Sequence, residues 1–527
     1  MQSRAGMYAR FIAGMPAFLK ERVTLDEARA TIAARLASRE ANFLNLLEHA
    51  VFSRPDNPYS FLLKEAGCEP GDLRRMVSMN GVDATLAELF DAGVRVSFDE
   101  FKGRSPIVRG GKTFAGASES FDNPLVERHY ESQSSGSTGK ATRVPSSLAS
   151  IALHAPMMIL AQEANGTFGA PVVLYVPGLP GNTATSNVLR QIITGNPVRR
   201  WFSPVASSET KSPIRFRLAG VATAPLVRAL GAPYPEMEVV PFDRAVVVAR
   251  AAEAFVQSEG RCLVRCSVSA ALTVSLAALD HGVDLTGVTF NGGGEPASPG
   301  KVRGITRSGA RYFTSYAMTE TGGIGAACVR GSDATDVHFF RDKLGVLQRD
   351  EQLGDNGEQV GVFFFTTLLA ASPKILINVS SDDFGLLEER TCGCPLHDLG
   401  LHQHLRQIRS VGKLTGRGIT LVASDIAHIV EEILPSEFGG TAQDYQLVEE
   451  ENGIGVTNLH LLISPSIFLP DESAPASTLL DALSRGTPGA SLQSAVLRSG
   501  SAIQVRREQP KLNARGKLPP FRTVAFR

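Results

Sequence analysis

The sequence has no excess of charge of either sign, because its 527 residues include 53 basic and 53 acidic residues. A net charge of zero removes the usual electrostatic argument for a nucleic-acid partner or an anionic membrane surface. Long apolar runs are also lacking: "GVFFFTTLLAA" at 361–371 stops well short of the roughly 20 residues that a membrane span needs. Near the start, Gly14 and Pro16 interrupt the apolar stretch before it reaches the length of a signal sequence. We therefore expect a cytoplasmic protein with no membrane span and no nucleic-acid partner.

Cysteine is scarce, with six in the chain, so a disulfide scaffold is not expected and the spacing of the cysteines carries the information. Cys262 and Cys266 lie in the apolar stretch "CLVRCSVSAALTVSLAALD", which we interpret as helical and buried. The last cysteine is Cys394, so residues 395–527 contain no thiol.

The length of the chain predicts two or more domains. Residues 17–50 alternate apolar and charged positions at helical spacing, with Thr24 as a candidate N-cap and Glu27 three residues later. Residues 60–95 continue in the same pattern. We expect residues 1–120 to form a mostly helical preface.

From about residue 150, short strand-like runs alternate with helical stretches, at 171–178, 238–242, 288–294 and 311–318. This alternation predicts an α/β domain with much parallel pairing. Past residue 410 a new unit begins, with a strand and helix at 419–434 and a strand at 458–465. The expected fold is a large N-terminal α/β body over 1–408, a boundary at 409–412 and a small α+β C-terminal domain over 413–527.

The stretch "SSGSTGK" at 134–140 combines glycines, hydroxyls and a lysine. It is not a Walker loop, because Ser134 stands where the first glycine is needed and Ala141 stands where a hydroxyl is needed. Glycine-rich turns that aim several N–H groups inward still bind phosphate, and serine and threonine hydroxyls add donors. A mobile surface loop is the alternative interpretation.

Three further segments place polar groups beside predicted strands. "NGGGEP" (291–296) and "SYAMTETGG" (315–323) each follow a strand, where α/β folds place ligands. "DDFG" (382–385) is expected to lead into a turn that presents a carboxylate to ribose hydroxyls.

Taken in this order, the segments resemble the adenylate-forming superfamily of acyl-CoA synthetases, adenylation domains and luciferases. "SYAMTE" is similar to the family's Y-G-x-T-E motif, with Ala317 in place of the glycine, and "DDFG" to its T-G-D-x-G motif. "QIRSVGK" (407–413) falls where the family has its G-R-x-D hinge, with Val411 in place of the aspartate, and "NARGKLP" (513–519) resembles the terminal catalytic-lysine motif. The branches of phenylacetate–CoA ligases and luminescence acyl-protein synthetases are the most similar.

The resemblance implies a nucleotide site. The β- and γ-phosphates of ATP would be held by Ser134, Ser135, Gly136, Ser137, Thr138, Gly139 and Lys140. The adenosine would be held by Gly293, Gly294, Glu295 and Tyr316 at the base and by Asp383 and Arg409 at the ribose. Asp382 stays open as the alternative ribose ligand.

The resemblance also implies catalytic roles. Thr319 would contact the α-phosphate, Glu320 would bind Mg²⁺, and Lys517 would stabilise the charge of the transition state. A lysine near a C-terminus is otherwise a solvated surface group. Met157 and Met158, which follow the phosphate loop, are apolar candidates for the acid pocket.

A metal site is predicted from the remaining cysteines. Cys328 precedes His338 by ten residues, and Cys392 and Cys394 flank one glycine in "TCGCP". Both segments lie beside nucleotide motifs, and three thiolates with one imidazole suit structural zinc. His397 is the substitute ligand if His338 points away, and the alternative is a set of reduced core cysteines with a core histidine.

The resemblance implies ATP-dependent activation of a carboxylic acid as acyl-adenylate, followed by transfer of the acyl group to a thiol. The thiol of coenzyme A is the favoured acceptor. Transfer to an acyl carrier protein or an amine, and a non-catalytic nucleotide-binding protein, are the open alternatives.

Overall fold

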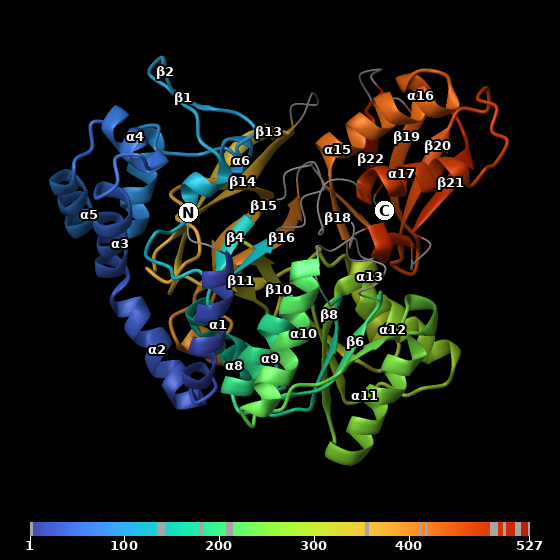
Figure 1. The fold of residues 1–527 in the computed structure, drawn as a ribbon, viewed down its shortest axis with the longest axis horizontal. Coiled ribbons are helices and arrows are strands. Elements are labelled where there is room, and N and C mark those ends of the chain that lie inside the picture. The colour runs from blue at the N-terminus through green and yellow to red at the C-terminus, as the bar shows by residue number, and fades with distance from the viewer. Residues whose placement is uncertain are drawn as a thin grey trace.

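A computed structural model gives the arrangement of the chain (Figure 1). The residues that it describes are 4–133, 143–178, 183–206, 214–353, 358–410, 413–416, 419–484, 494–498, 502–511 and 518–524. No helix in these ranges combines the length and apolarity that crossing a bilayer requires.

The N-terminal segment is helical, as predicted, up to about residue 102. Its helices are α1 (Arg4–Phe18), α2 (Leu25–Ala37), α3 (Arg39–Leu47), α4 (Pro58–Glu65), α5 (Pro70–Asp91) and α6 (Phe98–Lys102). Thr24 caps α2 in a capping box with Glu27, which confirms that local prediction. A hairpin of β1 (Ile107–Arg109) and β2 (Lys112–Phe114) follows, so the preface ends with strands.

The body is built on one 12-stranded sheet in the order β13-β14-β15-β16-β12-β11-β10-β9-β8-β5-β6-β7. One half is parallel: β5 (Val172–Tyr175), β6 (Val198–Ser203), β7 (Met237–Val239), β8 (Cys262–Ser267), β9 (Val288–Gly293) and β10 (Arg311–Met318). The other half is antiparallel: β11 (Gly322–Ala326), β12 (Val337–Phe339), β13 (Leu344–Leu353), β14 (Glu358–Thr367), β15 (Val379–Glu389) and β16 (Gln403–Ser410). The expected parallel pairing therefore holds for half of the sheet.

The prediction that Cys262 and Cys266 are helical is wrong. Both are buried in strand β8, and the helix α12 (Val268–Asp280) begins only after Ser267. Their burial in the core is as predicted. The prediction failed because a buried strand and a buried helix have the same apolar composition, so a short apolar run does not distinguish them.

Helices cover both faces of the parallel half (Figure 1). On one face α9 (Thr183–Ile193) packs into the hydrophobic cluster that includes Leu263 of β8. On the other face α11 (Val246–Glu259) and α12 pack into a cluster with Val264. The remaining elements of the body are β3 (Tyr130–Gln133), β4 (Arg143–Ser146), α7 (Leu148–Leu153), α8 (Ala155–Ala164), α10 (Ile214–Ala229), α13 (Pro299–Thr306) and α14 (Pro395–Asp398).

Beyond Ser410 the chain leaves the large sheet and forms an α+β unit, as the sequence predicts, drawn orange to red in Figure 1. Its elements are β17 (Lys413–Gly416), β18 (Ile419–Val422), α15 (Ala423–His428), α16 (Leu434–Phe438), β19 (Tyr445–Glu451), β20 (Thr457–Ile463), α17 (Ala474–Ser484), β21 (Ile503–Arg507) and β22 (Phe521–Val524). Four of them form a sheet in the order β21-β20-β19-β22 around a separate hydrophobic cluster.

Candidate active site and metal centre

Two of the predicted nucleotide motifs meet at the junction of β10 and β15. The hydroxyl of Tyr316, at the end of β10, donates a hydrogen bond to Oδ2 of Asp383 over 2.6 Å, although 67 positions separate them. Ser410, the last residue of β16, donates to Oδ1 of the same carboxylate over 2.5 Å. Burial and the adjacent carboxylate raise the pKa of Tyr316, so the phenol keeps its proton and acts as the donor.

The "DDFG" motif does not lead into a turn, and that prediction is wrong. All four residues lie inside strand β15, paired on one side with β14 and on the other with β16. The irregularity is local: Asp382 has a φ of 64°, in the left-handed region that aspartate tolerates better than most residues. Asp383 is thereby turned toward Tyr316, whereas Asp382 lines a different hollow.

Thr319 and Glu320 lie in the turn between β10 and β11. Glu320 is buried, and its Oε1 accepts from Nζ of Lys102 over 2.5 Å, across 218 positions of sequence. Burial alone would raise the pKa of Glu320, but the charge and hydrogen bond of Lys102 outweigh it and lower the pKa, so the side chain is a carboxylate. Sequence reasoning missed Lys102, because no local pattern connects α6 to this turn.

His154 and Lys343 contact the same turn between β10 and β11. Nζ of Lys343 donates to the carbonyl of Thr321 over 3.0 Å and lies 3.4 Å from Nδ1 of His154. A Cβ on Gly322 would lie 2.3 Å from Nε2 of His154, so only glycine fits against this ring. Burial lowers the pKa of Lys343 to about 7 and that of His154 well below its usual value. The sequence carries no signal for this pair.

The glycine segment after β9 turns with Gly294 at a φ of 82°, and a Cβ on Gly293 would lie 3.0 Å from the carbonyl of Ser315. The side chain of Glu295 is buried and already has partners. Its carboxylate accepts from the amide and hydroxyl of Ser269 over 2.6 and 2.9 Å and from Nζ of Lys301 over 2.8 Å. Glu295 therefore fixes the N-terminus of α12 in place.

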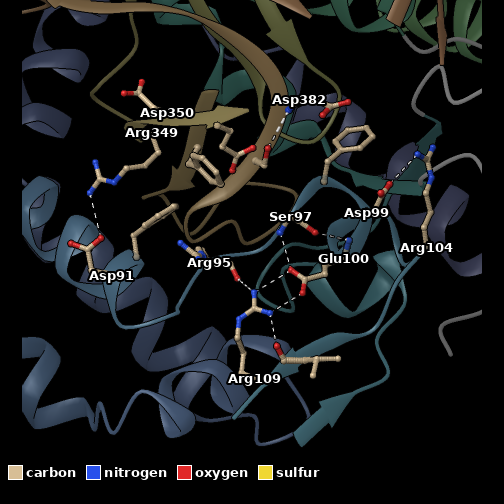
Figure 2. A pocket seen from close by; sticks show the side chains of 16 residues that line it. Asp91, Arg95, Ser97, Asp99, Glu100, Arg104, Arg109, Arg349, Asp350 and Asp382 are labelled. Carbon is tan, nitrogen blue, oxygen red and sulfur yellow. Dashed lines mark hydrogen bonds and ion pairs between the residues drawn. The ribbon is translucent and has the colours of Figure 1, made fainter. Parts of the chain in front are cut away.

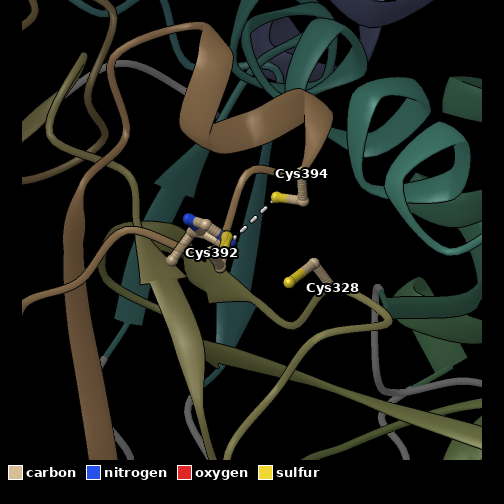
Figure 3. Close-up of side chains that lie close together, drawn as sticks. Cys328, Cys392 and Cys394 are labelled. Carbon is tan, nitrogen blue, oxygen red and sulfur yellow. Dashed lines mark hydrogen bonds between the residues drawn. The ribbon is translucent and has the colours of Figure 1, made fainter.

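The four residues of the predicted metal site come together (Figure 3). Cys328, His338, Cys392 and Cys394 are all buried, and their ligand atoms lie within 4.8 Å of one another. Nε2 of His338 is 3.2 Å from Sγ of Cys394 and 3.6 Å from Sγ of Cys392. His397 is not part of the group; its ring instead packs on His402.

Several other predicted residues are placed differently or not described. Arg409 is exposed on β16, opposite Phe384. Met157 and Met158 are buried in the cluster around the three cysteines, so they pack beside the metal group. The residues outside the described ranges are Ser134, Ser135, Gly136, Ser137, Thr138, Gly139, Lys140, Val411 and Lys517.

A hollow of about 930 Å³ lies between the N-terminal helices and β13–β15 (Figure 2). Its charges are largely paired across it, as Arg109 with Glu100 at 2.9 Å and Arg104 with Asp99 at 3.3 Å. The lining residues are Phe90, Asp91, Arg95, Ser97, Phe98, Asp99, Glu100, Arg104, Val108, Arg109, Arg349, Asp350, Glu351, Phe364, Ser380 and Asp382.

Comparison with known proteins gives the fold. No protein-family model matches the sequence, and no curated protein is significantly similar to it. Among solved structures, 2-hydroxyisobutyryl-CoA ligase with 2-HIB-AMP and CoA is similar over 95% of this chain and 90% of that chain, at a TM-score of 0.53 and 17% identity. The same ligase with R3-HIB-AMP matches over the same shares at 0.41 and 16%. Anthranilate CoA ligase with anthranoyl-AMP matches 77% of this chain and 67% of that chain at 0.34 and 10%. The first of these shows that the chain has the fold of this CoA ligase, consistent with the family that its motifs resemble.

Proposed function

We propose that the protein activates a carboxylic acid with ATP, releases pyrophosphate, and transfers the acyl group from the adenylate to the thiol of coenzyme A. The observation that carries the proposal is the contact of Tyr316 with Asp383, in a chain with this fold. Two motifs that the resemblance assigns to the base and the ribose of one nucleotide are neighbours in space, although they lie on strands far apart in sequence.

The proposed reaction begins when a carboxylate oxygen attacks the α-phosphorus of ATP, forming a carbonyl–oxygen–phosphorus anhydride and breaking the bond to pyrophosphate. Two anions must meet, so positioning and the stabilisation of negative charge supply most of the catalysis. Residues 134–140 hold the β- and γ-phosphates, Thr319 contacts the α-phosphate, and Lys517 stabilises the charge that accumulates there. Tyr316 and Asp383, with Gly293, Gly294 and Arg409, hold the adenosine.

The residues near Thr319 fit a magnesium ion. Glu320 is an ionised, buried carboxylate at the turn that follows β10, and hard carboxylate and phosphate oxygens are the ligands that Mg²⁺ prefers. Bound there with ATP, the ion would neutralise phosphate charge. Lys102 keeps Glu320 ionised in this role.

The second half-reaction is attack of a thiolate on the acyl carbonyl, with AMP as the leaving group. Coenzyme A is the proposed acceptor, in a reaction like that of phenylacetate–CoA ligases. The proposal includes a hinge at 409–412 between a body of 1–408 and a lid of 413–527, which would carry Lys517 to the site. It is supported by the large sheet ending at Ser410 and by the separate hydrophobic cluster of the C-terminal unit.

The proposal also includes a structural zinc ion held by Cys328, His338, Cys392 and Cys394. Nδ1 of His338 lies 2.7 Å from the carbonyl of Leu401, so Nδ1 carries the proton and the lone pair of Nε2 faces the sulfurs. The separations between ligand atoms suit zinc, with bonds of about 2.3 Å to sulfur and about 2.0 Å to nitrogen. Four protein ligands leave no position for substrate, so the ion would tie the loop after β11 to the loop after β15.

ATP–pyrophosphate exchange with a panel of aryl and fatty acids tests the proposed function. Exchange that depends on one class of acid is the expected result, and thioester formation from that acid and coenzyme A should follow. Binding of ATP without exchange for any acid would favour a non-catalytic nucleotide-binding protein instead. Exchange followed by amide formation, or by acylation of a carrier protein in place of coenzyme A, would overturn the proposed acceptor. The cytoplasmic location inferred from the sequence stays a prediction.

A further inference from the structure

An arginine side chain lies on the inner face of the parallel sheet, where apolar residues are the rule. Along β8, Cys262, Val264 and Cys266 belong to the hydrophobic cluster on one face, and Leu263 belongs to the cluster on the other face. Side chains alternate along a strand, so Arg265 shares the face of Leu263, the face that α9 covers. It pairs in register with Leu174 of β5 and Asn291 of β9.

A second arginine approaches from the covering helix. Arg190 lies on α9, whose neighbouring residues Val188, Leu189 and Ile192 pack into the same cluster as Leu263. Burial and the charge of Arg190 lower the pKa of Arg265 to about 9, and burial lowers that of Arg190 to about 10. Arg190 and Arg265 thus lie within electrostatic reach of each other between helix and sheet.

Neither guanidinium has an acidic partner among the described residues. Within the described ranges, Arg190 donates only from Nε, to the carbonyl of Ile151 at 3.4 Å, and the side chain of Arg265 makes no hydrogen bond or ion pair. Each residue as a whole is half-buried. Holding two unpaired cations close together inside a protein is costly unless an anion completes the site.

The other charged groups nearby add positive charge. The charge of Arg190 also acts on Lys343 and His154, which contact the turn between β10 and β11. Asp342 is the acid on this side, and it is engaged by Arg35 at 3.3 Å and by the charge of Lys343. Among the described residues, the groups around Arg190 and Arg265 therefore carry more positive than negative charge.

We propose that Arg190 and Arg265 bind a second anionic group of the carboxylic acid substrate, so that the enzyme activates one end of a dicarboxylic acid. The inference rests on the proposed function. Strand β8 is separated from β10, which carries Tyr316 and precedes Thr319, by β9 alone. In the register Arg265 is level with Phe313 of β10, six residues before Thr319, so the acid would extend back along β10 from a reacting carboxylate near Thr319 to a distal oxyanion near the side chain of Arg265. A planar guanidinium matches a carboxylate in two hydrogen bonds, which makes arginine suited to this selection.

The test compares matched acids of equal length, with and without the distal carboxylate, over a range of lengths: butanoate with succinate, octanoate with octanedioate, and decanoate with decanedioate. The purified full chain is studied by thermal stabilisation with the acid alone and by ATP–pyrophosphate exchange. The diacid of at least one pair should have a kcat/KM about tenfold or more above that of its monoacid, as expected for hydrogen bonds between charged groups. It should also raise the melting temperature more than the monoacid does.

In Arg265→Met, and independently in Arg190→Met, the ratio of diacid to monoacid kcat/KM should fall toward one. The melting temperature of Arg265→Met without ligand should not decrease, because an unpaired charge is removed from the interior. Arg200→Met is the matched control, since Arg200 lies on the adjacent part of the same sheet but is paired with Glu238 at the surface, and it should keep the wild-type ratio.

Equal use of monoacid and diacid by the wild type, or an unchanged ratio in both variants, would overturn the inference while leaving the proposed function standing. Loss of stabilisation by ATP or pyrophosphate alone in Arg265→Met would show that the arginines bind phosphate, and would also overturn it. If no acid supports exchange, the proposed function fails. The anion site is then decided by whether a diacid stabilises the wild type but not Arg265→Met.

Discussion

The hydroxyl of Tyr316 donates to the carboxylate of Asp383 over 2.6 Å and so joins the last residues of β10 to the irregular part of β15. The contact has two consequences for the carboxylate. One of its oxygens is fixed by a phenol that keeps its proton, and the other by the hydroxyl of Ser410. Asp383 is therefore held in a fixed orientation by two hydrogen-bond donors, Tyr316 and Ser410.

The first prediction separates the two adjacent aspartates. Asp383→Ala should raise the KM for ATP by about tenfold or more, because hydrogen bonds to a charged group contribute about 1.5–3 kcal/mol. Asp382→Asn is the control, because asparagine tolerates the φ of 64° at this position, and it should change the KM by less than about twofold, since Asp382 lines the separate hollow of Figure 2. The measurement is exchange at varied ATP concentration. A larger rise in the KM for ATP from the Asp382 variant than from Asp383→Ala would mean that Asp382, and not Asp383, contacts the ribose.

The second prediction concerns Lys102. Its charge and hydrogen bond hold the pKa of Glu320 below its usual value against the effect of burial. In Lys102→Met burial alone remains, so the pKa should rise and Glu320 should take up a proton at a higher pH. Activity that requires the carboxylate is lost as pH falls through its pKa, so the acid limb of the pH profile of kcat/KM should move to higher pH. Lys112→Met removes an exposed lysine that pairs with Glu65, and its profile should match that of the wild type.

Local features of the fold could be predicted from the sequence. The capping box of Thr24 and the bounds of β10 depend on neighbouring residues alone, and both are found as predicted. "DDFG" was misjudged because aspartate and glycine favour turns, whereas pairing with β14 and β16 on both sides imposes a strand.

The site was predictable only where a motif names its residues. The metal group could be assembled from cysteine spacing because its ligands are rare residue types that flank the nucleotide motifs. Lys102 and His154 could not be found, since each reaches the turn after β10 from a distant part of the chain. Arg190 and Arg265 lack any motif, and only the packing of α9 into the same hydrophobic cluster as Leu263 of β8 brings them together.

The third prediction concerns the two lysines outside the described residues. Lys517→Ala should lower the rate of adenylation by about 10²–10³-fold, the usual effect of removing a group that stabilises transition-state charge. Lys140→Ala should mainly raise the KM for ATP, because the leaving pyrophosphate is also neutralised by Mg²⁺. Exchange rates of both variants at saturating ATP make the comparison. A near-native rate for Lys517→Ala would remove it from the catalytic set.

The fourth prediction is that the protein, purified without chelators, contains about one equivalent of zinc. Elemental analysis measures this content. Cys394→Ser should lower the zinc content and the melting temperature, because the proposed ion would tie the loop after β11 to the loop before α14. His397→Ala is the control and should retain zinc, since His397 lies outside the ligand group. A zinc content below about a tenth of an equivalent in the wild type would exclude a structural zinc site.

The last prediction tests the C-terminal unit as a lid. In the structure, Oγ of Ser298 at the start of α13 donates to Oε1 of Glu451 over 2.6 Å, and the β19–β20 loop lies against the same helix. A Cβ on Gly455 in that loop would lie 2.4 Å from the backbone of Gly300, whereas a Cβ on Gly453 would meet nothing within 4 Å.

Gly455→Val should therefore block this docked arrangement, and Gly453→Val should permit it. If each half-reaction uses its own arrangement of body and lid, Gly455→Val should slow one half-reaction by about tenfold or more, the effect of about 1.4 kcal/mol on its barrier. The other half-reaction should stay within about twofold of the wild type. Exchange reports adenylation, and thioester formation from preformed acyl-adenylate reports transfer. A lower melting temperature with equal loss in both steps would mean that the substitution strains the loop, which has a φ of 86° at Gly455, and would remove the support for a swivelling lid.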